Sequence, residues 1–330
     1  MEHKIQNKLA LFAANTQAIK KEFPWQDSLT KRLAALIYAQ DTKPIDCESI
    51  RQCHDLIKQN TGAFSTFRGN MALCLAALLS LSPGPQRLFS ETLKVYDLLK
   101  GVKFRASDYL VVAAYQIAAQ SNSADYPKVV NRTRAFYDDM KARHSFYTGE
   151  DDYIYTAMLG LSDLNVTAGI EGIERLYSRL KGEFRDKNSV QALSQVLVLG
   201  GSDDACMDRV LALRNAFKAE KIRLDKSFTL PVLGILALLP VEFDLIVRGI
   251  IEAQQALLAE KGFGPLSVTT QELLLFAATL VASGYGESIG EGVLTATLST
   301  SITNIIIAQQ AAMIAAITAS TVAVTVSSSS

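Results

Sequence analysis

A repeat with a period of about 40 residues constrains the fold of this chain more than any other feature of its sequence. The segments DLIK, DLLK and DDMK end at Lys58, Lys100 and Lys141, and looser copies follow as SRLK, NAFK and QALL. Each copy places an apolar anchor residue near the end of a predicted helix, with apolar positions recurring about three, four and seven residues earlier. The anchors are Ile57, Leu99, Met140, Leu180, Phe217 and Leu257. The pattern predicts one type of amphipathic helix, used six times.

Shorter and far more apolar segments lie between these helices. They begin at Leu33, Met71, Tyr109, Tyr153, Ala192, Val232 and Glu272. A helix that is hydrophobic on nearly every side is one that is covered on every side. We therefore expect an all-α fold made of helical-hairpin repeats of about 40 residues, stacked as an α-solenoid or a compact superhelical array. The sequence has no alternation of strand and helix patterns of the kind that predicts a parallel sheet.

The chain divides into three predicted regions. Residues 1–25 form an N-terminal capping helix, which Pro24 ends. Residues 26–283 form a helical-repeat domain of about six helix pairs. Residues 284–330 begin with a glycine-rich joint, continue as an uncharged helical tail rich in Ala, Ile, Ser and Thr, and end in a short β-prone segment.

The tail is unusual because residues 292–330 contain no charged side chain. Its densest apolar stretch, residues 305–319, is interrupted by Gln309 and Gln310 and is shorter than the roughly 20 residues that a membrane span needs. Membrane insertion is therefore not the favoured interpretation. The tail is expected either to cover the last repeat of its own chain or to join a second copy in a homo-oligomer.

The charge and composition of the chain narrow the classes of partner that it is expected to bind. The chain has 33 basic and 33 acidic residues, so it lacks the excess of positive charge with which proteins attract nucleic acid. No secretory signal is evident, and four scattered cysteines favour the cytoplasm. The expected partner is another protein or the chain itself, without a cofactor.

Four short features occur in a recognisable order. They are an FRGN segment at 67–70, a YDLLKG helix end at 96–101, a GGSD turn at 200–203 and the uncharged tail. In this order they resemble DUF4003, a bacterial family of unknown function found mainly in Firmicutes. The resemblance implies a cytoplasmic, all-helical protein and brings no catalytic residue with it.

One loop carries the best candidate for chemistry. A histidine beside three carboxylates can bind a metal or transfer protons. The acidic residues also stand where the next helix begins, a place that the helix dipole favours for carboxylates. The residues of this loop are His144, Tyr147, Glu150, Asp151 and Asp152. An all-helical enzyme with its site here is the alternative to a binding protein.

Five of the anchors are followed at once by a lysine. Such a row of ammonium groups can recognise an acidic partner, but a cation in the last turn of a helix is also stabilised by the free carbonyls there. The lysines are Lys58, Lys100, Lys141, Lys181 and Lys218.

Aromatic residues three positions before the anchors are further binding candidates. Tyr96, Tyr137 and Tyr177 share this position with His54. The structural interpretation is that the position lies at the rim of the core, where an amphipathic ring keeps its polar end in water.

Other motifs predict no ligand. Cys47, Cys53 and His54 lack a second pair of ligands at the spacing of a zinc site, so no metal is predicted. The glycine-rich residues 283–290 lack the lysine of a P-loop. The sequence thus favours a non-enzymatic cytoplasmic helical-repeat protein that acts as a protein-binding or self-assembling scaffold. The alternatives are the enzyme near His144 and a membrane-associated protein that uses its tail.

Overall fold

The computed structural model describes residues 2–201, 204–226 and 229–290 of the 330, and these residues form an all-helical fold. The predicted fold class is therefore confirmed at the level of all-α. The predicted tail, 292–330, and half of the GGSD turn lie outside the described residues.

One set of helices is amphipathic, with one buried stripe each. They are α1 (Glu2–Glu22), α3 (Cys47–Asn60), α5 (Pro85–Gly101), α7 (Tyr126–Arg143), α9 (Val166–Leu180), α11 (Asp204–Ala219) and α13 (Phe243–Ala259). All six predicted anchors lie on these helices, and each is at most 2% exposed. Their burial is confirmed.

A second set of helices alternates with the first and is buried almost throughout. It comprises α2 (Ser28–Gln40), α4 (Ala72–Ser80), α6 (Asp108–Gln120), α8 (Tyr153–Leu161), α10 (Lys187–Leu199), α12 (Leu230–Leu238) and α14 (Thr270–Gly290). Short 3₁₀ helices, η1 (Thr66–Arg68) and η2 (Glu150–Asp152), precede α4 and α8. We call this second set the apolar helices.

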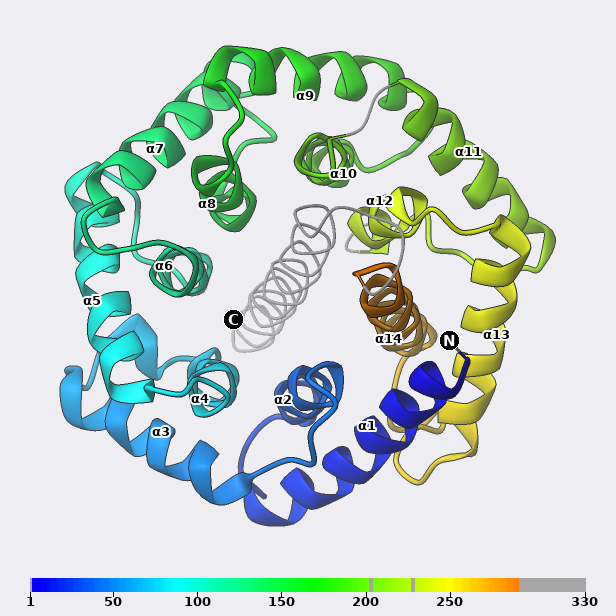
Figure 1. Cartoon of the computed structure of the whole chain (residues 1–330), viewed down its shortest axis with the longest axis horizontal. Helices are drawn as coiled ribbons and strands as arrows, with labels where there is room; N and C mark the ends of the chain where they lie inside the picture. Colours follow the sequence, from blue (N-terminus) through cyan, green and yellow to red (C-terminus); the bar gives the residue numbers. More distant parts are fainter. Residues whose placement is uncertain (1, 202–203, 227–228, 291–330) are drawn as a thin grey trace, which may run out of the picture. The chain divides into compact units, whose positions relative to one another are not determined.

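The chain folds into two compact units that are interleaved in sequence. Among the described residues, unit 1 takes 2–21, 38–45 and the chain from Thr167 on, and unit 2 takes 22–37 and 46–166. In unit 2, the apolar helices α4, α6 and α8 are seen nearly end-on in Figure 1, while α5 and α7 run across the view. In unit 1, α10 and α12 are seen end-on in the same way, beside α9 and α11.

Contacts between α1 and the end of the described chain hold unit 1 together. The ring of Phe12 on α1 meets Phe263, just after α13, and Phe276 on α14 edge-on, at centroid distances of 5.1 and 5.2 Å. Gly284 lets the backbone of α14 approach α1, because a Cβ there would lie 2.5 Å from Ile5 Cγ1. The glycine-rich joint expected from residue 284 is therefore wrong for 284–290, which continue α14 as helix to Gly290.

Two arginines on different amphipathic helices make the same set of hydrogen bonds. Arg132 on α7 donates to the carbonyl oxygens 28, 30 and 32 residues further on, those of Gly160, Ser162 and Leu164, at 3.0, 2.8 and 2.6 Å. Arg209 on α11 donates to carbonyls at the same three offsets, at 3.0, 2.7 and 3.1 Å. Each arginine thus satisfies backbone acceptors that the end of an apolar helix leaves without a helical partner.

Candidate functional site

The structure places every lysine of the predicted row at a helix end, and each has a contact within its own unit. Lys58 lies 3.7 Å from Asp55 on the same helix. Lys141 Nζ donates to the carbonyls of Ser145 and Thr148, at 2.6 and 2.5 Å, and so ties down the loop after α7. These contacts account for two lysines without a partner protein.

Two of the predicted tyrosines each contact the predicted lysine that lies four residues further along the chain. The ammonium of Lys100 lies 5.8 Å from the ring centroid of Tyr96, and that of Lys181 lies 5.9 Å from the ring centroid of Tyr177. An ammonium within about 6 Å of an aromatic face is attracted to it. The repeated Tyr and Lys positions are thereby brought together as pairs at the end of one helix.

The third predicted tyrosine packs inside an aromatic cluster. The ring of Tyr137 lies 5.3 Å from the centroids of both Phe104 and Tyr153. Burial raises the pKa of Tyr137 to about 12. This ring therefore contributes to the rim of the core, as the structural interpretation of its position predicts.

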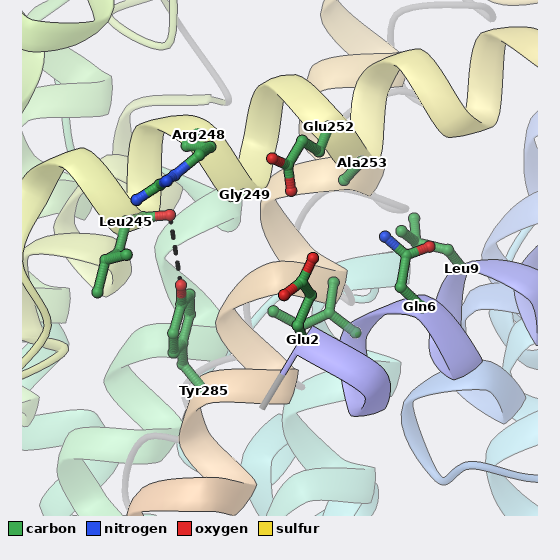
Figure 2. Close-up of a pocket in the computed structure, with 10 residues that line it drawn as sticks. Glu2, Gln6, Leu9, Leu245, Arg248, Gly249, Glu252, Ala253 and Tyr285 are labelled. Atoms are coloured by element: carbon green, nitrogen blue, oxygen red, sulfur yellow. Dashed lines mark hydrogen bonds between the residues drawn. The ribbon is translucent and has the colours of Figure 1, made fainter.

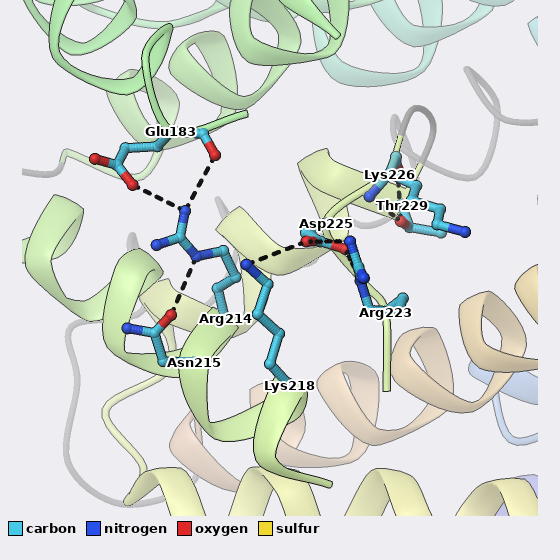
Figure 3. Close-up of polar contacts among 8 residues, drawn as sticks. All are labelled: Glu183, Arg214, Asn215, Lys218, Arg223, Asp225, Lys226 and Thr229. Carbon is cyan, nitrogen blue, oxygen red and sulfur yellow. Dashed lines mark hydrogen bonds and ion pairs between the residues drawn. The ribbon is translucent and has the colours of Figure 1, made fainter. Parts of the chain in front are cut away.

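Lys218 belongs to a charge network on one side of unit 1 (Figure 3). Its ammonium lies 3.7 Å from Asp225, which also accepts two hydrogen bonds from Arg223, at 2.8 and 3.2 Å. Burial alone would raise the pKa of Asp225, but the hydrogen bonds and positive charge of Arg223 and Lys218 outweigh it and lower that pKa. A neighbouring cation, Arg214, donates to the Glu183 carboxylate at 3.0 Å.

The His144 loop is held by its own backbone. His144 caps the end of α7, its N–H donating to Met140 O at 2.8 Å, and its carbonyl accepts from the N–H groups of Tyr147 and Thr148. Asp152 is 2% exposed, and its carboxylate accepts from the N–H of Gly149 at 2.9 Å. The structure thus gives Asp152 a capping contact at the start of the next helix.

The acidic groups of this loop also lie near Tyr109. Burial raises the pKa of Tyr109, and the charges of Asp151, Glu150 and Asp152 raise it further. Within the described residues no three His, Cys, Asp or Glu side chains are grouped so that they would hold a metal ion. The arrangement places several carboxylates near Tyr109 at the start of α6.

The apolar helices of unit 2 begin at the same end of that unit. The thiol of Cys74, on α4, lies 3.6 Å from Thr30 O on α2. A Cβ on Gly69, just before α4, would lie 3.2 Å from the carboxylate of Asp108, where α6 begins. The hydroxyl of Tyr153, where α8 begins, accepts from the backbone N–H of Arg105, just before α6, at 3.4 Å. The loops that lead into these helices, 23–27, 61–71, 102–107 and 144–152, therefore form one surface, which we call the turn face.

Three aromatic side chains stand out from the turn face. Trp25, Phe64 and Phe146 are 96%, 104% and 96% exposed. Tyr147, beside Phe146, is 39% exposed. The large exposed side chains of a binding surface are commonly aromatic, because such rings supply much contact area at little entropic cost.

The loop that carries Phe64 is firmly anchored close by. Phe67 is 2% exposed and meets the rings of Phe89 and Tyr96 at centroid distances of 5.7 and 4.9 Å. The hydroxyls of Thr66 and Tyr96 are 2.8 Å apart. Phe64 is thus presented by a fixed loop.

The loops that carry the other two rings are tied down as well. In the sequence, Phe146 lies between Ser145 and Thr148, whose carbonyls accept hydrogen bonds from Lys141 Nζ. Trp25 lies in a turn that Gln26 closes by donating its N–H to Phe23 O at 3.2 Å, and Asp27 then caps α2 by accepting from Leu29 N–H at 2.8 Å. Each of the three exposed rings therefore projects from a hydrogen-bonded loop.

Trp25, Phe64 and Phe146 are not among the binding residues that the sequence pattern predicts. One sequence signal could have identified them. They lie in loops between an amphipathic and an apolar helix, where a solvated turn usually carries polar residues rather than large aromatic ones.

The fold defines a class of all-helical protein in which amphipathic helices alternate with buried apolar helices. Within that class the chain belongs to the family described as "Protein of unknown function (DUF4003)", whose model matches residues 15–311. This confirms the resemblance that the FRGN and YDLLKG segments indicate. The chain is also 23% identical to the uncharacterized protein YeaA of Bacillus subtilis (strain 168) over 333 residues, which cover 98% of each chain. No solved structure matches it.

Proposed function

We propose that this chain is a non-enzymatic cytoplasmic scaffold that binds a protein partner through the turn face of unit 2. The proposal includes an array of stacked helical hairpins as the framework. Identical hydrogen bonds at identical offsets from Arg132 on α7 and Arg209 on α11 support such a repeat.

The exposure of Trp25, Phe64 and Phe146 on one surface is the observation that carries the proposal. Full burial of one such side chain is worth about 1.5–3 kcal/mol. Because the three side chains project from anchored loops, binding a partner there loses little conformational entropy, and little of this favourable free energy is offset. They have the character of interface anchors.

The charge of the same surface indicates the character of the partner. Asp27, Glu150 and Asp151 lie on the turn face and Asp108 follows it directly, while the basic residues of the same loops are Arg68, Lys103 and Arg105. Charges of both signs around aromatic side chains are complementary to a partner whose apolar pockets are bordered by both acidic and basic groups.

Affinity capture with a triple variant, W25S/F64S/F146S, tests the proposal. The wild-type chain and the variant L266A would be compared with it, because Leu266 is equally exposed but lies in unit 1. We expect the same partner to be captured from a native lysate by the wild type and by L266A, and to be lost with the triple variant. Circular dichroism and thermal unfolding check that the triple variant remains folded. Retention of that partner by the folded triple variant would contradict the proposal.

The enzyme near His144 is the competing proposal for the same face. The double variant H144A/D151A leaves the three aromatic side chains in place. If binding is the function, this variant keeps both the partner and any cellular phenotype of the protein. Loss of the phenotype with the partner complex preserved would favour catalysis.

Self-association through residues 292–330 is a separate proposal, which rests on the uncharged sequence of that region. The variant I302K/I306K places two charges on its predicted apolar stripe. Light scattering is expected to show an oligomer for the wild type and a monomer for this variant. Equal masses would contradict the proposal. Among the described helices, none has the length and apolar character that crossing a membrane requires.

A further inference from the structure

Unit 1 contains a cavity of about 470 Å³ between α1, α13 and α14. Its apolar wall consists of Ile5, Leu9 and Ala253, each at most 7% exposed. Four exposed polar side chains also line the cavity, those of Glu2, Gln6, Arg248 and Glu252 (Figure 2). A volume of this order is typical of cavities that hold small organic ligands.

A glycine on α13 leaves the cavity open. Arg132 and Arg209 each stand eight residues before an anchor, and the corresponding position before Leu257 is Gly249. The guanidinium groups of the two arginines reach the carbonyls at the end of the apolar helix that follows, whereas Gly249 has no side chain and α14 continues past the corresponding positions to Gly290. A Cβ at 249 would lie 3.6 Å from Val281 and 3.9 Å from the Tyr285 hydroxyl, which is ordinary contact. The position therefore has room for alanine, and a larger side chain would enter the cavity.

The polar groups form an acidic part and a basic part. Glu2 on α1 and Glu252 on α13 point toward each other across the opening, while Arg248 extends toward Leu245 and Tyr285 (Figure 2). None of the ion pairs found in the part of the chain that the structure describes includes these three charged side chains.

Tyr285 marks where the two parts meet. It is 6% exposed, and its hydroxyl donates to Leu245 O at 3.3 Å. Burial raises the pKa of Tyr285, Arg248 acts to lower it, and Glu252 and Glu2 act to raise it. Charges of both signs therefore act on one buried hydroxyl at the wall of the cavity.

We propose that this cavity binds a short zwitterionic peptide of about two residues. Its ammonium group lies between Glu2 and Glu252, its carboxylate binds Arg248, and its apolar side chain packs on Ile5 and Leu9. A simple cation would leave Arg248 without a counter-charge, and a simple anion would place like charges beside two carboxylates. A zwitterion with an apolar body matches all three parts of the site.

Calorimetric titration of the full chain with three matched probes tests the charge assignment. The dipeptide Ala-Leu carries both charges, its N-acetyl form lacks the ammonium and its C-terminal amide lacks the carboxylate. We expect Ala-Leu to bind and each blocked form to bind at least about tenfold more weakly, because each loses a charge-assisted interaction. Absence of Ala-Leu binding, or equal binding of the amide, would overturn the proposal.

Variants locate the binding within the cavity. G249L fills the cavity and is expected to abolish Ala-Leu binding, whereas G249A adds only a methyl group and keeps it. E2Q/E252Q keeps the shape of the site and is expected to weaken binding at least about tenfold, so the test holds even if G249L fails to fold. E260Q, which changes an exposed carboxylate elsewhere in unit 1, is the matched control and binds as the wild type does. Unchanged affinity in E2Q/E252Q would also overturn the proposal.

Discussion

Replacing Arg132 by alanine removes three hydrogen bonds at once from the end of α8. Hydrogen bonds that involve a charged group contribute about 1.5–3 kcal/mol each. Gly160 is buried, but Ser162 and Leu164 are partly exposed, so water can replace the guanidinium at two of the three carbonyls. We therefore expect Arg132→Ala to cost about 2–4 kcal/mol, well below the sum of the three bonds. Arg132→Lys should cost less than Arg132→Ala but still destabilise the protein, because one ammonium group cannot reproduce the planar set of donors of the guanidinium.

Hydrogen–deuterium exchange at the end of α8, together with thermal unfolding, measures this cost. The control is Arg143→Ala on the same helix, which removes the surface ion pair with Asp139 and should cost below about 1 kcal/mol. The proposed repeat adds a further requirement, that Arg209→Ala destabilise the end of α12 to a similar degree. A cost for Arg132→Ala no larger than that for Arg143→Ala would refute the reasoning.

Three further predictions concern stability. Leu99→Ala should cost about 2–5 kcal/mol because the anchor is fully buried, and Lys100→Ala should cost below about 1 kcal/mol; similar costs in urea unfolding would contradict the anchor assignment. Gly160→Ala should cost at least about 1–3 kcal/mol, because its Cβ would clash with the side-chain oxygen of Thr133 and lie 2.9 Å from the backbone nitrogen of Thr133; an unchanged melting temperature would contradict this close packing. The lowered pKa of Asp225 stabilises the fold above the unfolded value of about 4, and this contribution is lost as pH falls through the lower folded value. Asp225→Asn should therefore be less stable than the wild type at pH 7, with the difference shrinking below about pH 4 in urea unfolding.

The helices could be predicted from the sequence because their signals are local. An amphipathic stripe needs only the spacing of apolar residues within one helix, and a fully apolar segment indicates burial by itself. All six anchors from Ile57 to Leu257 were placed correctly in this way. The start of α1 and its end before Pro24 follow from the same kind of signal.

The binding surfaces could not be predicted because they depend on packing between distant segments. Phe64 and Phe67 are two phenylalanines of one loop, yet the first is fully exposed and the second is 2% exposed. Nothing in their immediate sequence tells which ring has Phe89 and Tyr96 to pack against. The cavity of unit 1 likewise requires α1 to meet α13 and α14. The position of Gly249 in the repeat does not predict the cavity either, because the copy anchored at Leu180 has Gly172 at the same position, packed against Val198.

The edge-on packing of Phe12 against Phe263 and Phe276 has a consequence for how the protein is made. Most of the chain separates the two sides of that contact in the sequence. A ribosome adds roughly 5–20 residues per second, so the apolar face of α1 waits about 12–50 s after its own synthesis before its partners emerge. The described residues of unit 2 end at 166, so all of them are synthesised well within that interval. For much of its synthesis the nascent chain therefore carries the described residues of unit 2 together with α1, whose apolar face is still exposed. Chaperones that recognise such faces would act in that window.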